Sequence, residues 1–125
     1  MNEIRIGTKE ERIAFQPGEM IDGAIGWDLQ ETLQSIEVRL SWQTRGKGTE
    51  DSEVVDRVRF DAPSLQGAQP FQFIAPAQPY SFSGKLISVV WFLEVAVRPK
   101  GPSARKEIVI APGLKEVLLG EPAPE

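Results

Sequence analysis

Two alternating apolar segments, joined by a proline-rich loop, constrain this chain more than any other feature. Phe71 to Ala75 is the shorter segment, Lys85 to Val97 is the longer one, and residues 76–84 connect them. Because successive side chains of a strand point to opposite faces, such alternation predicts strands with one buried face. The stretch therefore predicts a β-sandwich rather than an enzyme pocket.

The first half of the chain adds a regular strand and an irregular one. Ser35 to Thr44 alternates cleanly between apolar and polar residues. Burial of its four large apolar side chains is worth roughly 1.5–3 kcal/mol each, so this face is expected in the core. Glu53 to Asp61 places Val54, Val58 and Phe60 on one side, but Asp56 breaks that side, which predicts an edge or a twist.

Similar patterns elsewhere in the sequence predict the remaining strands. About eight short antiparallel strands separated by turns are typical of an immunoglobulin-like sandwich. Ten prolines and eleven glycines fit the many turns of an all-β fold. The remaining candidate strands are Glu3 to Lys9, Arg12 to Gln16, Met20 to Leu29, Arg105 to Ala111 and, as a last short one, Leu114 to Leu119.

The length of 125 residues predicts one domain with a core of its own. We expect a single β-sandwich domain over residues 1–119 and a flexible C-terminal tail over residues 120–125, where the sequence reads GEPAPE.

The absence of cysteine and histidine excludes several kinds of chemistry. Disulfides, thiolate catalysis, Ser-His-Asp triads and zinc sites built on Cys or His need those side chains. We therefore expect no enzyme activity, no cofactor and no metal. A chain that needs no disulfides is expected in the reducing cytoplasm.

Charge and hydropathy limit the partners. A net charge of −4 argues against nucleic-acid binding as the main role. No apolar run approaches the roughly 20 residues of a membrane-spanning helix.

Two elements of the sequence resemble the arrestin family. Phe15 to Gly23, with Pro17-Gly18-Glu19 at its centre, resembles the aromatic-x-Pro-Gly-Glu-x-apolar-x-Gly element in which a strand turns into the next one. Phe71 to Phe73, followed by Pro79 to Gly84 and the long strand Leu86 to Val97, resembles the segment that passes through a Pro-Ser-x-x-Gly loop. The resemblance covers most of residues 3–111.

The resemblance implies an arrestin-type β-sandwich with a scaffold role. Arrestins and their relatives, which include the retromer cargo subunit and bacterial sporulation-control proteins, usually carry two such sandwiches, whereas this chain has room for one. It shows no clathrin-box, PPxY or polar-core element, so receptor binding and endocytic adaptor function are not carried over.

Four residues are candidates for contact with a partner. Tyr80 and Phe82 lie in the proline-rich loop, and Val90 and Phe92 lie on the face of the long strand opposite Trp91. If that face is exposed, Val90 and Phe92 form an apolar patch that a partner, a second copy or the C-terminal segment would cover.

The alternative is a small-ligand or carbohydrate-binding module. It would use Tyr80, Phe82 and a tryptophan as flat contact surfaces. However, Trp27, Trp42 and Trp91 fall on the inward parity of their strands, which predicts that they belong to the core. The favoured interpretation is a non-catalytic scaffold or adaptor domain that binds protein, either by strand addition at a sheet edge or on the face of Val90 and Phe92, with homodimerisation as its simplest form.

Overall fold

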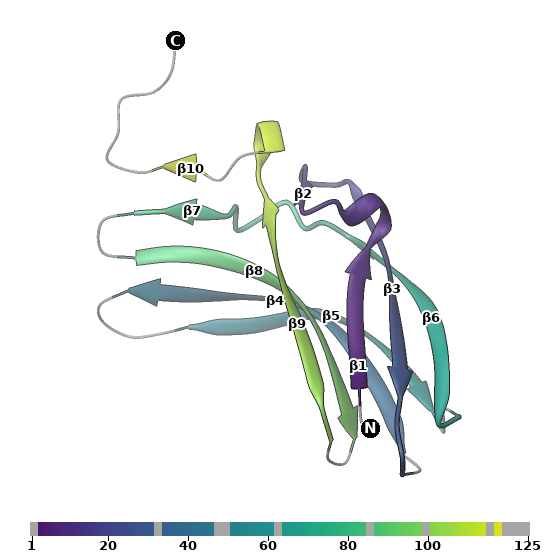
Figure 1. The fold of residues 1–125 in the computed structure, drawn as a ribbon. Coiled ribbons are helices and arrows are strands. Elements are labelled where there is room, and N and C mark those ends of the chain that lie inside the picture. The colour runs from purple at the N-terminus through teal and green to yellow at the C-terminus, as the bar shows by residue number, and fades with distance from the viewer. Residues whose placement is uncertain are drawn as a thin grey trace.

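The computed structural model describes residues 3–31, 34–46, 51–61, 64–84, 87–98, 101–114 and 117–118. Figure 1 shows an all-β arrangement with two layers of strands. The predicted C-terminal tail, residues 120–125, lies outside the described residues. Among the described residues, no helix has the length and apolar character needed to cross a membrane.

Within the described part of the chain, the smaller sheet has three antiparallel strands in the order β1-β3-β6, so β6 is an outer strand. Its members are β1 (Glu3–Thr8), β3 (Met20–Asp28) and β6 (Gln66–Ile74).

The larger sheet has seven strands among the residues that the structure describes, with β8 at its centre between β4 and the pair β7 and β9. Its long strands are antiparallel, whereas two of its two-residue strands pair in parallel, β2 with β9 and β10 with β7. Its members are β2 (Ala14–Phe15), β4 (Ser35–Gly46), β5 (Ser52–Asp61), β7 (Phe82–Ser83), β8 (Ile87–Arg98), β9 (Ser103–Ile110) and β10 (Val117–Leu118). Two 3₁₀ turns, η1 (Lys9–Glu11) and η2 (Pro112–Leu114), lie in the connections.

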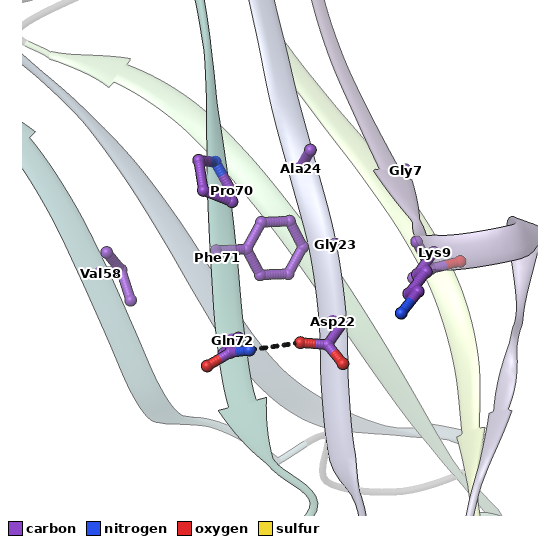
Figure 2. A pocket seen from close by; sticks show the side chains of 10 residues that line it. Gly7, Lys9, Asp22, Gly23, Ala24, Val58, Pro70, Phe71 and Gln72 are labelled. Atoms are coloured by element: carbon purple, nitrogen blue, oxygen red, sulfur yellow. Dashed lines mark hydrogen bonds between the residues drawn. The ribbon is translucent and has the colours of Figure 1, made fainter.

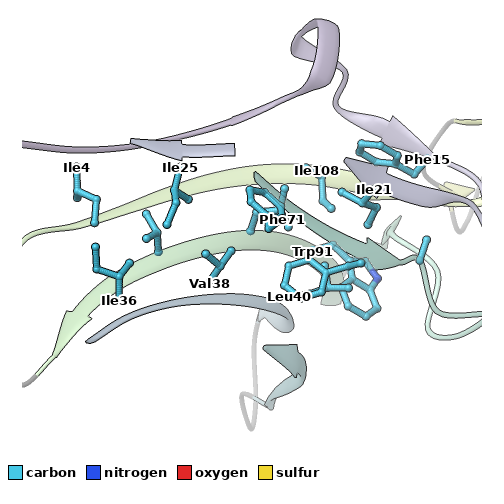
Figure 3. Packing of buried hydrophobic residues seen from close by; sticks show 14 of the residues in the cluster. Ile4, Phe15, Ile21, Ile25, Ile36, Val38, Leu40, Phe71, Trp91 and Ile108 are labelled. Atoms are coloured by element: carbon cyan, nitrogen blue, oxygen red, sulfur yellow. The ribbon is translucent and has the colours of Figure 1, made fainter. Parts of the chain in front are cut away.

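Apolar side chains from both sheets meet in one core. Ile21, Ile25 and Phe71 of the smaller sheet face Ile36, Val38, Leu40 and Trp91 of the larger one, as Figure 3 shows. The predicted inward faces of Ser35–Thr44 and of the long strand are thereby confirmed. Trp27 and Trp91 are buried, and Trp42 is half-buried against the same core.

The irregular strand β5 carries a β-bulge. Its register against β4 shifts between Leu40 and Ser41, so that Leu40 faces Asp56 and Ser41 faces Val54. The extra residue moves Val55 onto the core in place of Val54, which is exposed. The break at Asp56 therefore marks a bulge in an outer strand.

The strand β6 is longer than the sequence predicts. The alternating pattern predicts its start at Phe71, but β6 begins at Gln66 and pairs with β3 along its whole length. Gly67 pairs with Trp27, and a Cβ at Gly67 would lie 2.7 Å from the indole carbon Cζ2. The Trp27 indole takes the place that a side chain at Gly67 would need, so this half of β6 shows no apolar alternation of its own.

The Pro17-Gly18-Glu19 turn joins β2 to β3, and several hydrogen bonds hold its conformation. Gly18 has a φ of +83°, which favours glycine, and its N–H donates to the carbonyl of Ala75 at 2.8 Å. The Glu19 carboxylate accepts from Arg12 Nη2 at 2.5 Å and from the backbone N–H of Gln16 at 2.9 Å. Glu19 therefore has a structural role in the turn.

These bonds make the stability of the fold sensitive to acid. The hydrogen bond from Arg12, and then the one from the Gln16 N–H, lower the pKa of Glu19 below its ordinary value of 4.5. A carboxyl whose pKa is lower in the folded state adds stability above the unfolded pKa and loses it as the pH falls through the folded pKa. We expect Glu19→Gln to lower the free energy of unfolding at pH 7, and the difference from wild type to shrink from about pH 4.5 downward.

Urea unfolding of both proteins between pH 7 and pH 3 measures that difference. Glu3→Gln is the matched control, because Glu3 pairs with Arg5 at the surface, where ion pairs contribute little. If Glu19→Gln lowers the free energy of unfolding by the same amount from pH 7 down to pH 3, the lowered pKa of Glu19 is contradicted.

Candidate interaction groove

The strand β8 changes its neighbour at Val90. Towards its C-terminus it pairs with β9, beginning with Trp91 opposite Ile108, and before Val90 it pairs with β7, with Val89 opposite Phe82. Because β9 continues past Ile108 to pair with β2, β7 and β9 separate at this point. We call this separation the fork.

Ser81 holds the two sides of the fork together. Its N–H donates to the carbonyl of Ile110 at 2.8 Å, and its Oγ accepts from the N–H of Ile110 at 3.0 Å. Trp91 Nε1–H donates to the carbonyl of Pro79 at 2.8 Å. The proline-rich loop is therefore anchored to β8 and β9 rather than loosely attached.

A groove of about 250 Å³ lies at the fork. Arg45, Ser88 and Ser83 form a row across β4, β8 and β7, because Ser88 is the register partner of both others. The groove combines this polar row with apolar residues, Val89 and Val90 of β8 and Ile108 and Val109 of β9. Its lining includes Arg45, Ser81, Ser83, Ser88, Val90 and Glu107.

The structure brings three of the four predicted contact residues to this groove or next to it. Val90 lines the groove and is half-buried. Phe82 pairs with Val89 and is also half-buried. Tyr80 precedes Ser81 in the loop and is 39% exposed, the most accessible of the four.

Phe92 lies under two guanidinium groups instead of forming an exposed patch. It is only 3% exposed, with Arg105 Cζ 3.6 Å and Arg45 Cζ 5.2 Å from its ring centroid. Arg105 Nη2 also donates to Gln43 Oε1 at 2.8 Å, and Arg45 Nη1 lies 3.3 Å from Glu107 Oε1. Cations held over an aromatic face in this way are attracted by the ring. Contact between Phe92 and a partner would require both arginines to move.

Ion pairs occupy the neighbouring part of the same face. Arg39 bridges two carboxylates, with Nε 2.7 Å from Glu37 Oε1 and Nη1 3.0 Å from Glu94 Oε1. Glu37 is buried among its neighbours. This part of the sheet is therefore polar and internally paired, and Val90 offers apolar surface beside it.

A larger hollow of about 810 Å³ lies beside the smaller sheet. Figure 2 shows the Phe71 ring directed at Gly23, and Gln72 bonded to Asp22. The Gln72 Nε2 donates to Asp22 Oδ1 at 2.6 Å, so these two polar side chains satisfy each other. Glycines at positions 7 and 23 and Ala24 contribute little side chain, which accounts for the hollow.

Comparisons with known proteins support the fold. No protein-family model matches the chain, and no curated protein matches it. Among solved structures, the chain is similar to the crystal structure of Spo0M, a sporulation control protein from Bacillus subtilis, with a TM-score of 0.64 and 17% sequence identity. The match covers 88% of this chain and 49% of the Spo0M chain, so this chain spans about half the length of that protein. Such a likeness shows the fold alone, an arrestin-like β-sandwich, as the sequence resemblance predicts.

Proposed function

We propose that this chain is a non-catalytic scaffold domain that binds a protein partner at the fork groove. One arrangement carries the proposal. Val90 and the polar row on β4, β7 and β8 line the groove, and the exposed Tyr80 lies next to it on an anchored loop. An aromatic side chain held on a rigid support beside apolar surface is typical of the residues that dominate protein interfaces. The fold, the missing histidines and cysteines and the Spo0M likeness are consistent with a scaffold, which we place in the cytoplasm.

The structure gives less support to small-ligand or carbohydrate binding. That alternative needs a tryptophan beside Tyr80 and Phe82, but Trp27 and Trp91 are buried and Trp42 packs against the core. Only Tyr80 is substantially exposed among the aromatic residues that it would use.

Affinity capture from an extract of the source organism tests the proposal. Phe92 is a poor probe because it is buried, so the variant of choice is Tyr80→Ser. We expect a partner that the wild type retains to bind the variant at least tenfold more weakly, about 1.4 kcal/mol, as for an aromatic residue central to an interface.

Leu65→Ser is the matched control. Leu65 is 43% exposed, similar to Tyr80, but it precedes β6, whereas the proline-rich loop follows that strand. Nine strand residues separate the two ends by roughly 30 Å. A partner lost equally with both variants, or retained equally by both, would count against the groove.

A further inference from the structure

The outer strand β6 has an exposed and uncharged edge. Among the described strands it has a neighbour only on the β3 side, and every residue from Gln66 to Pro70 is exposed. The sequence holds no Asp, Glu, Lys or Arg from Ser64 to Gly84. An outer strand of this kind presents backbone groups to which another strand can bond.

Hydrogen bonds just beyond both ends of β6 show which backbone groups face outward. The Ala75 N–H donates to the Glu19 carbonyl, and the Leu29 N–H donates to the Leu65 carbonyl, both at 2.8 Å. The register between these points is unbroken, and backbone groups alternate in direction along an antiparallel strand. Odd-numbered residues of this segment therefore bond to β3. The outward groups belong to Gln66, Ala68, Pro70, Gln72 and Ile74.

The strand β5, at an edge of the larger sheet, has the features that usually prevent pairing. It is bulged at Val55, and it carries five charged side chains, Glu53, Asp56, Arg57, Arg59 and Asp61. Bulges and charges at an edge disfavour the addition of another strand. On β6 the feature that disfavours pairing is Pro70, which lacks an N–H at an outward position.

We propose that β6 pairs with β6 of a second copy of this chain, antiparallel and across a two-fold axis at Pro70. An uncharged edge meets its own copy without like-charge repulsion, and a two-fold contact needs only one self-complementary segment. In this register Ala68 of each copy faces Gln72 of the other, and Gln66 faces Ile74. The pairing goes beyond the proposed function, because it uses the edge of β6 and not the fork groove.

Pro70 limits the strength of this pairing. At the axis each proline faces the other, and neither supplies an N–H to the opposite carbonyl. Pro70→Thr restores both donors and places a strand-forming residue there. We expect wild-type dimerisation to be weak and the dissociation constant of Pro70→Thr to be about tenfold lower, because two backbone hydrogen bonds are added.

A charge exchange tests the register by sedimentation equilibrium. The double variant with Ala68→Lys and Gln72→Lys places like charges opposite each other, as does the double variant with Ala68→Glu and Gln72→Glu. We expect each to be monomeric alone, and an equimolar mixture of the two to form a heterodimer. Val54→Lys, on the edge of β5, is the control and leaves dimerisation unchanged.

Amide exchange provides a measurement without variants. As concentration rises, we expect the outward N–H groups of Gln72 and Ile74 to gain protection, whereas Phe71 and Phe73 are protected throughout. A wild-type chain that stays monomeric up to about 1 mM, or a mixture of the two charged variants that does not associate, would overturn the pairing. The proposed function fails separately, by equal capture of a partner with Tyr80→Ser and Leu65→Ser.

Discussion

Trp91→Ala is expected to lower the free energy of unfolding by about 3–5 kcal/mol, as for other large aromatic residues removed from a core. Trp91 has no exposed surface and lies at the centre of the larger sheet, opposite Trp42 on β4 and Ile108 on β9. Its indole N–H also holds the Pro79 carbonyl at 2.8 Å. The substitution therefore opens a cavity and releases the proline-rich loop, and urea unfolding measures the sum.

Trp91→Phe separates the two effects. Phenylalanine retains most of the apolar volume but cannot donate to Pro79, so we expect a smaller loss of stability than with alanine. Tyr80 and the fork depend on the anchored loop, and the phenylalanine variant is therefore also expected to weaken partner capture. A cost of less than about 1 kcal/mol for Trp91→Ala would mean that Trp91 is not a core residue.

Gly23→Ala is expected to cost about 3 kcal/mol, at the upper end for an overpacked site. A Cβ at this position would lie 2.4 Å from Cζ of the Phe71 ring and 2.5 Å from the carbonyl oxygen of Gly7. The ring can shift, but the carbonyl belongs to the neighbouring strand β1, where Gly7 pairs with Ala24 and Thr8 pairs with Gly23. Relief of the clash therefore requires movement of the backbone of the sheet.

Gly7→Ala is the matched control from the adjacent strand. A Cβ at Gly7 meets nothing within 4 Å. Replacement of a glycine at an unstrained position usually stabilises by about 0.4–1 kcal/mol, through the unfolded chain. Urea unfolding of the two variants should therefore give changes of opposite sign, and equal changes would contradict the packing of Phe71 on Gly23.

Alternating patterns made most of the fold predictable. Large apolar residues fall on one parity in Ser35–Thr44 and in the long strand β8, and both proved to be core strands. The start of β6 was missed because Gly67 has no side chain and the indole that packs beside it belongs to Trp27, a residue far away in the sequence. On β5, Val58 and Phe60 pack against the core as their pattern indicates, but Val54 was placed on the wrong side because a bulge leaves no direct mark in the residue pattern.

The candidate site was only partly predictable, because contacts between neighbouring strands leave no mark in the residue pattern of one strand. Tyr80, Phe82 and Val90 stand out as apolar residues in positions where solvent is expected, and the structure places them at or beside the fork. The cover over Phe92 comes from Arg45 and Arg105, which belong to two different neighbouring strands. Only the register of the sheet brings those guanidinium groups together.

Titration of a captured partner into ¹⁵N-labelled chain shows whether that partner binds at the fork groove. We expect the largest amide shifts at Ser81, Ser88 and Val90, which line the groove. Shifts confined to the sheet formed by β1, β3 and β6, with these three amides unmoved, would contradict it.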